Sequence, residues 1–380
     1  MTAATARRPS PRPAPTGRQL SHAPALSGLR GLAVAAVLYH HLPTDHGPRG
    51  FGVVGVSSFF ALSGFLIAAL LVREWDRHGS IAVSEFYRRR VVRLLPALVA
   101  FLPVVVVWAA LAGFDETRQA LFATLWVSNW ARINDEPMGV LAHTWTLAIE
   151  AQFYVVAPLL FLGAVRGRFS ARPWLLPAAL AGLVAAWRAS LWLFAGGLVG
   201  WADGGLLIYV TRATDTRLDA ILLGVAAAFV FARSRLVVPG PVAAVAATAL
   251  VALGFVDPEG DAMITIGIAA AALASCVVIL HLVTASSPLD RALSTRPLVQ
   301  LGVVSYGLYL WHLPVYKLLA HQFPDWPWPL VGGLGVATSL LLATLSYRYV
   351  ERPFLGHRRP RTPGPSGGSA PPPAHAVAAT

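Results

Sequence analysis

Cysteine, lysine and acidic side chains are all scarce in this chain of 380 residues. Cys276 is the single cysteine, so an intrachain disulfide and a metal site built from cysteines are both excluded. The sequence also lacks the HExxH pattern of zinc proteases, a Walker phosphate-binding loop and the GxGxxG pattern of dinucleotide-binding folds. ATP-driven transport by this chain is therefore not expected, and neither is a permanently bound metal or cofactor.

Charged residues make up only 13% of the sequence, whereas hydrophobic residues make up 56% and the mean hydropathy is +0.60. Water-soluble globular domains do not have this composition, so the sequence predicts an all-α, multi-pass protein of the lipid bilayer. The net charge of +12 comes almost wholly from arginine, because Lys317 is the only lysine. In a membrane protein this excess is first of all a topology signal, and it does not indicate nucleic-acid binding.

Ten apolar runs are candidates to cross the membrane, and arginine marks their orientation. Arginines cluster before the first run and after the second, fourth, sixth, eighth and tenth, whereas Asp257–Asp261, between the seventh and the eighth, is acidic. The positive-inside rule therefore places both termini in the cytoplasm. Leu121–Trp130 is short and polar at its ends, so we interpret it as re-entrant or interfacial. The ten runs lie near 26–42, 51–72, 93–112, 146–164, 173–195, 217–233, 240–256, 261–283, 299–319 and 328–350.

Both ends of the chain differ in composition from the membrane segments. Residues 1–24 are rich in Pro, Arg, Ala and Ser and contain no apolar stretch of the kind a cleaved signal peptide needs. Residues 356–380 are rich in Pro, Gly and Ala. Such compositions predict disordered tails. One membrane domain, residues 25–355, is expected between them, in the cytoplasmic (inner) membrane.

Arg30 and His41 are the first candidate site residues. Eleven steps of about 100° bring His41 back to within roughly 20° of Arg30, some 16 Å further along a helix. His40 falls about 80° away from that line. Ionisable groups within a membrane helix are costly and mark functional sites. The alternative interpretation is that Arg30 extends to the headgroups and that the two histidines end the helix there.

Arg90 and Arg93 form a second candidate site near the cytoplasmic side. They are three residues apart, so they share one face of a helix. Guanidinium groups bind phosphate in a bidentate manner, which suits a donor that carries a diphosphate. Ordinary positive-inside anchoring is the alternative, and it accounts well for the neighbouring Arg88 and Arg89.

Three further polar groups lie within or beside apolar runs. Glu150 lies one turn inside the fourth run, where a carboxylate could orient a histidine or bind an acceptor hydroxyl; pairing with a structural arginine is the alternative. Arg217 and Asp219 are expected to pair with each other in a structural role. His312 follows an aromatic cluster and is either a second polar site residue or a histidine hydrogen-bonded to a neighbouring helix.

Taken in order, these stretches resemble the motifs of the acyltransferase 3 family of integral membrane acyltransferases. Arg30 and His41 match its Arg-x10-His pattern, and Arg90–Arg93 resembles its Arg-x-x-Arg motif. The likeness extends from about residue 26 to residue 355. The other matching stretches are Gly55–Ile67, Thr144–Tyr154, Thr216–Asp219, Ser305–His312 and Glu351–Pro353.

The sequence departs from the family pattern in three respects. The histidine is doubled, and both the spacing and the helix face favour His41 over His40. Ala151 stands where the family often has a second glutamate. The sequence has no counterpart of the extracytoplasmic SGNH-type hydrolase domain that is fused to some members, so a stand-alone form is expected.

The resemblance implies transfer of an acyl group, often acetyl, from acyl-CoA to a hydroxyl of a sugar-containing acceptor. It assigns His41 as general base with Glu150 as second catalytic residue, and donor binding to Arg30, Arg90 and Arg93. Trp145, Tyr154 and His312 lie in matching stretches and are expected to bind substrate. The acceptor is expected to be an envelope glycan or a glycosylated natural product such as a macrolide. A secondary transporter of a small solute is the competing function.

Overall fold

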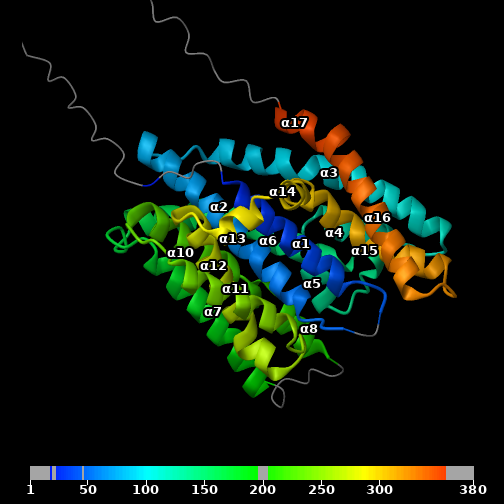
Figure 1. Ribbon diagram of the computed structural model, residues 1–380. Helices are drawn as coiled ribbons and strands as arrows, with labels where there is room; N and C mark the ends of the chain where they lie inside the picture. Colours follow the sequence, from blue (N-terminus) through cyan, green and yellow to red (C-terminus); the bar gives the residue numbers. More distant parts are fainter. Residues whose placement is uncertain (1–17, 19–22, 45–46, 196–203, 357–380) are drawn as a thin grey trace, which may run out of the picture.

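The computed structural model describes residues 18, 23–44, 47–195 and 204–356, and within these ranges the chain forms helices and no strand (Figure 1). The predicted all-α class is therefore confirmed. The predicted tails lie almost entirely outside the described residues. The helices are α1 (Pro24–His40), α2 (Phe51–His78), α3 (Val83–Leu111), α4 (Thr117–Thr124), α5 (Ser128–Ile133), η1 (Gly139–Thr144), α6 (Trp145–Arg166), α7 (Leu175–Phe194), α8 (Gly205–Arg212), α9 (Thr214–Arg217), α10 (Asp219–Arg233), α11 (Gly240–Gly254), η3 (Met263–Gly267), α12 (Ile268–Thr284), α13 (Pro288–Leu293), α14 (Arg296–Val303), α15 (Ser305–Gln322), α16 (Trp328–Ser346), η4 (Tyr347–Glu351) and α17 (Arg352–Gly356).

Each of the ten predicted spans overlaps a helix, but the helices differ in length. Within the described part of the chain, six helical segments are long and apolar enough to cross a membrane, and the bent pair α14 and α15, which meet at 72°, brings the number to seven if it counts as one span. The remaining three, α1, α10 and α11, have 17, 15 and 15 residues, fewer than the roughly 20 that a span needs. These six or seven candidate spans support the predicted multi-pass architecture, and the count of ten stays a prediction.

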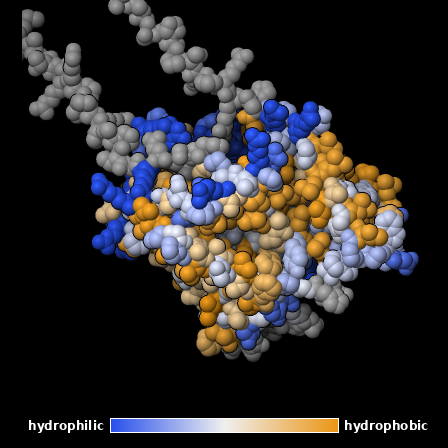
Figure 2. All heavy atoms as spheres, viewed as in Figure 1, coloured by the Kyte–Doolittle hydropathy of each residue, from blue (hydrophilic) through white to orange (hydrophobic). Residues whose placement is uncertain are grey.

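The segment Leu121–Trp130 falls across α4 and α5, which have eight and six residues. Neither helix is long enough to span a bilayer. Across the rest of the surface, hydrophobic residues cover most of the face seen in Figure 2, whereas hydrophilic residues gather near α17 and at the connection between α2 and α3. This distribution fits a protein surrounded by lipid along its middle.

Local sequence signals explain where several helices begin and end. A proline occupies the first turn of α1, α11, α13, α14 and α16, where its missing N–H is not needed for helix hydrogen bonds. Gly79 ends α2 with a left-handed φ of 65°, and its N–H donates to the carbonyl of Trp75. This is a common way for a helix to stop, because glycine adopts the left-handed region without a steric penalty.

Helix α2 lies at the centre of the bundle and contacts α1, α6, α10, α11 and α12. Its closest neighbour is α10, and two glycines allow the backbones to meet. A Cβ atom on Gly64 would lie 2.0 Å from the carbonyl oxygen of Ile221, and one on Gly224 would lie 2.1 Å from that of Ala61. Small residues at helix crossings permit this close approach within membranes. This contact holds α2 in place, and α2 contributes lining residues to both of the cavities described below.

We expect Gly64→Ala to lower the free energy of unfolding by about 3 kcal/mol or more, because the new methyl group meets backbone rather than a movable side chain. Gly182→Ala in α7 is the matched control. A Cβ atom there meets nothing within 4 Å, so the exchange should leave stability unchanged or raise it by up to about 1 kcal/mol. Unfolding of the two variants in mixed micelles measures the difference. Equal stabilities would contradict the α2–α10 packing.

Candidate active site

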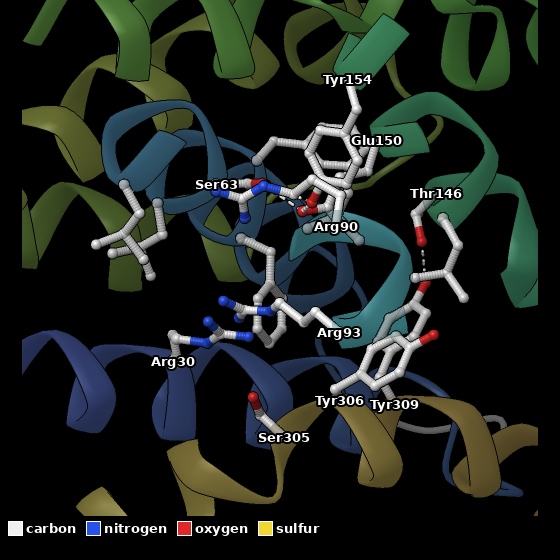
Figure 3. A pocket seen from close by; sticks show the side chains of 16 residues that line it. Arg30, Ser63, Arg90, Arg93, Thr146, Glu150, Tyr154, Ser305, Tyr306 and Tyr309 are labelled. Carbon is white, nitrogen blue, oxygen red and sulfur yellow. Dashed lines mark hydrogen bonds between the residues drawn. The ribbon is translucent and has the colours of Figure 1, made fainter. Parts of the chain in front are cut away.

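A first cavity lies between α1, α2, α3, α6 and α15 and holds about 670 Å³ of unfilled space, part of it open to solvent. Its apolar wall comes mainly from α2, including Phe59, Phe60 and Leu66. Figure 3 shows the polar side chains that line it. They are Arg30, Ser63, Arg90, Arg93, Thr146, Glu150, Tyr154, Ser305, Tyr306 and Tyr309.

Three arginines gather in this cavity around one carboxylate. Arg90 and Arg93 both line it, as their spacing on one helix face predicts. The guanidinium groups of Arg30 and Arg93 point toward each other (Figure 3). Within the described ranges, none of the three forms an ion pair with a carboxylate, and Nε of Arg30 and of Arg90 is buried without a hydrogen-bond partner. Such an excess of buried positive charge suits a multiply charged anion.

Glu150 is held by two hydroxyl groups. Its Oε1 atom accepts hydrogen bonds from the hydroxyls of Ser63 and Tyr154. Tyr154 is four residues further along α6, so it lies on the same helix face as Glu150. The guanidinium of Arg90 lies 5.4 Å from the centre of the Tyr154 ring. The carboxylate is therefore fixed beside the arginines rather than paired with one of them.

A second cavity, of about 1050 Å³, lies around the opposite end of α1. His40, His41, His143 and Trp145 line it, together with residues of α2, α5, α8, α9 and α12. Val56 and Tyr309 line both cavities. The Tyr309 hydroxyl shares a hydrogen bond of 2.6 Å with that of Thr146 and donates to the carbonyl of His143 at 3.0 Å. The two cavities therefore adjoin at a fixed tyrosine.

The imidazole of His41 contacts that of His312. Nδ1 of His41 lies 3.0 Å from the carbonyl oxygen of Val37, and Nδ1 of His312 lies 2.7 Å from that of Tyr309. Carbonyls only accept, so both Nδ1 atoms carry the proton. Nε2 of His312, 3.3 Å from Nδ1 of His41, then faces that N–H with a lone pair. This assignment leaves Nε2 of His41 unprotonated, as a general base requires.

Two more histidines surround this pair. The His40 ring lies 4.7 Å from that of His41, and its Nδ1 is 2.7 Å from the carbonyl oxygen of Arg49. The His143 ring lies 5.2 Å from that of His312, and its Nε2 is 3.0 Å from the carbonyl oxygen of Leu310. Among the described residues, no three His, Cys, Asp or Glu side chains are placed to hold a metal ion. Each of the four imidazoles is bonded to a backbone carbonyl.

The predicted site residues fall into two groups. Arg30, Arg90, Arg93, Glu150 and Tyr154 line the first cavity, whereas His41 and Trp145 line the second, with His312 against His41. His312, rather than Glu150, contacts the His41 imidazole, and Glu150 is bonded to Ser63 and Tyr154. Sequence reasoning missed Ser63 and Tyr309, although both lie in stretches that carry the family resemblance.

The predicted pairing of Arg217 with Asp219 is wrong. Oδ2 of Asp219 accepts from Nη1 of Arg188 at 2.7 Å, and Arg188 is completely buried. Arg188 also donates to the carbonyls of Thr216 and Ile264. Residues two apart do not face each other on a helix, so a partner from α7 takes the carboxylate. Arg217 instead lies 5.9 Å from the Trp145 ring centre and lines the second cavity.

The sequence is similar to a known family of proteins and to several curated relatives. A family model for an acyltransferase domain, acyltransferase 3, matches residues 24–348. The peptidoglycan O-acetyltransferase OatA of Listeria monocytogenes is 32% identical over 365 residues, which cover 88% of this chain and 56% of the relative. The O-acetyltransferase OatA of Staphylococcus aureus is 31% identical, with 87% and 57% covered. The chain thus spans somewhat more than half the length of these curated relatives. No solved structure matches.

Proposed function

Because the chain belongs to the acyltransferase 3 family, we propose that it transfers an acyl group, preferably acetyl, from acyl-CoA to a hydroxyl of a sugar-containing acceptor. The observation that carries this proposal is the pair of adjoining cavities. One contains three guanidinium groups that form no ion pair with any described carboxylate, and the other contains a histidine whose tautomer leaves a basic nitrogen. Tyr309 and Val56 separate them. We therefore place donor and acceptor in separate sites that meet at Val56 and Tyr309.

The first cavity is proposed to bind the donor. Arg30, Arg90 and Arg93 hold the phosphates of CoA through charge-assisted hydrogen bonds, which are strong where water is scarce. The pantetheine arm then extends along the apolar wall toward Tyr309. Oε2 of Glu150 has no hydrogen-bond partner among the described residues, since Ser63 and Tyr154 both bond Oε1. It is placed to accept from an amide N–H of the arm and so to position the thioester. Tyr154 supports this wall.

The second cavity is proposed to bind the acceptor. Nε2 of His41 takes the proton of the acceptor hydroxyl as its oxygen attacks the thioester carbonyl. When the tetrahedral intermediate collapses, the C–S bond breaks, and the CoA thiolate receives that proton. The lone pair of His312 faces Nδ1–H of His41 and stabilises the imidazolium formed between the two steps. Trp145 offers an apolar face against which a sugar ring can pack.

We further propose ten spans within residues 25–355, with both termini in the cytoplasm and the protein in the cytoplasmic membrane. In this orientation the arginine-lined cavity opens to the compartment that contains acyl-CoA. The shorter helices α1, α10 and α11 cross as parts of the bundle. Since the Listeria relative is named for peptidoglycan, an envelope glycan is the preferred acceptor, and a glycosylated natural product such as a macrolide is the alternative.

Arg93→Ala is expected to raise KM for acetyl-CoA by about tenfold to a hundredfold, because the variant loses one charge-assisted hydrogen bond to phosphate. Initial rates of CoA release over a range of acetyl-CoA concentrations measure this effect. Arg88→Ala is the matched control, because Arg88 is on the same helix but is 67% exposed and bound to Glu85. Its KM should stay within about twofold of wild type. Equal KM values for the two variants would contradict the placement of the donor site in the first cavity.

A further inference from the structure

The second cavity contains more positive charge than a neutral sugar requires. Arg132, Arg212 and Arg217 line it, and Glu259 is the one carboxylate among its lining residues. These four come from α5, α8, α9 and the connection between α11 and η3, so the fold brings them together from distant parts of the chain. The mechanism above uses none of them.

The three guanidinium groups of this cavity form no ion pair with a carboxylate within the described ranges. Arg217 is 3% exposed, and its buried Nε has no hydrogen-bond partner. Arg212 is half-buried and lies close enough to Arg132 and Glu259 to interact with both charges. Glu259 is exposed at the rim. Buried cations without partners are costly, and an incoming anion removes that cost.

The chain segment that contains Arg217 is held by Arg188. Arg188 binds the carbonyl of Thr216 on one side and the carboxylate of Asp219 on the other. The Trp145 ring, which lines the same cavity, lies against the guanidinium of Arg217. A guanidinium beside an aromatic face offers one group for an anion and one for a sugar ring.

We propose that the second cavity binds an anionic acceptor, a sugar that carries a phosphate or a carboxylate within reach of Arg132, Arg212 and Arg217. This inference rests on the proposed function in that it calls the ligand an acceptor. Binding of an anion in this cavity can nevertheless be measured without catalysis. The shared chemistry is a negatively charged oxygen that guanidinium groups bind bidentately. A sugar phosphate, as in a lipid-linked precursor, and a sugar acid, as in an acidic glycan, are its two sources.

The test is equilibrium binding to the full chain in nanodiscs of phosphatidylcholine, with no acyl-CoA present. The probes are N-acetylglucosamine 1-phosphate, glucuronic acid and methyl N-acetylglucosaminide. We expect at least one anionic probe to bind about tenfold or more tightly than the neutral glycoside. Arg212→Gln should weaken that probe by about tenfold or more, as expected for one charge-assisted hydrogen bond. The tighter of the two anionic probes identifies the source.

Two further variants make the test sharper. Glu259→Gln removes the rim carboxylate, so it should tighten the anionic probe several-fold and leave the neutral glycoside unchanged. Arg235→Gln removes one charge at an exposed position outside the cavity and should change neither affinity. Because Glu259 is exposed, its replacement does not endanger folding.

Three results would overturn the inference. In the first, both anionic probes bind no more tightly than the neutral glycoside. In the second, Arg212→Gln and Arg235→Gln have equal effects. In the third, adenosine 3′,5′-bisphosphate displaces the sugar probe, and its own affinity falls in Arg212→Gln but not in Arg93→Ala, which would assign the cavity to the donor. Acetyl transfer to the neutral glycoside without anion binding would contradict this inference alone, whereas anion binding without CoA release would support it and contradict the proposed transfer.

Discussion

His41→Ala is expected to lower kcat/KM for acetyl transfer by a factor between about 100 and 10,000, the range that a positioned general base contributes. Nε2 of His41 is the only nitrogen of its ring left without a proton by the contacts with Val37 and His312. Its ring contacts that of His312, whose Nε2 lone pair faces Nδ1–H of His41. Steady-state rates of CoA release in the presence of a glycan acceptor measure the loss.

His40→Ala is the matched control for this prediction. His40 is adjacent in sequence and lines the same cavity, but its Nδ1 donates to the carbonyl of Arg49 rather than facing the lone pair of His312. Its rate should stay within a few-fold of wild type. If His40→Ala loses as much activity as His41→Ala while both proteins remain folded, the assignment of the base from the Arg-x10-His spacing is wrong.

The second large effect concerns stability. Arg188→Leu should lower the free energy of unfolding by about 3 to 5 kcal/mol, because it leaves the carboxylate of Asp219 buried and unpaired. Asp219→Leu should cost a similar amount, since it leaves the guanidinium unpaired. Both side chains are essentially inaccessible, at 0% and 1% exposure. Unfolding in mixed micelles, followed by tryptophan fluorescence, measures each change.

The double variant Arg188→Leu/Asp219→Leu separates charge from packing. With both charges removed, stability should recover by about 2 kcal/mol or more relative to either single variant, although the carbonyls of Thr216 and Ile264 lose a donor. If the loss of unfolding free energy in the double variant equals the sum of the losses in the two single variants, the two residues contribute independently. The buried ion pair would then not be what holds the turn before α10.

Sequence reasoning succeeded where the signal is local. Each apolar run yields a helix because backbone groups in a membrane must be bonded within their own segment. The spacing of Arg90 and Arg93 placed both on one wall of the first cavity, since periodicity fixes which residues share a helix face. The same arithmetic separated Arg30 and His41 along α1, and each now lines a different cavity.

Contacts between distant segments could not be read from the sequence. His312 meets His41 across 271 residues, and Arg188 takes the carboxylate that Arg217 was expected to hold. Helical periodicity says which face a residue occupies but not which helix packs against that face. Arg212 gave no signal at all, because a basic residue at the end of a short helix resembles ordinary anchoring.

The most direct test of the proposed function is release of free CoA from acetyl-CoA by the wild-type protein in nanodiscs, with a soluble glycan oligomer that carries a carboxylate or a phosphate as acceptor. Cys276 is buried, so a thiol reagent detects released CoA with little background from the protein. The account predicts acetyl-CoA-dependent release of CoA and an equal amount of acetyl ester on the oligomer. If the protein neither binds nor consumes acetyl-CoA, and instead carries a small solute across liposome membranes, the transporter function is correct and the proposed transfer is wrong.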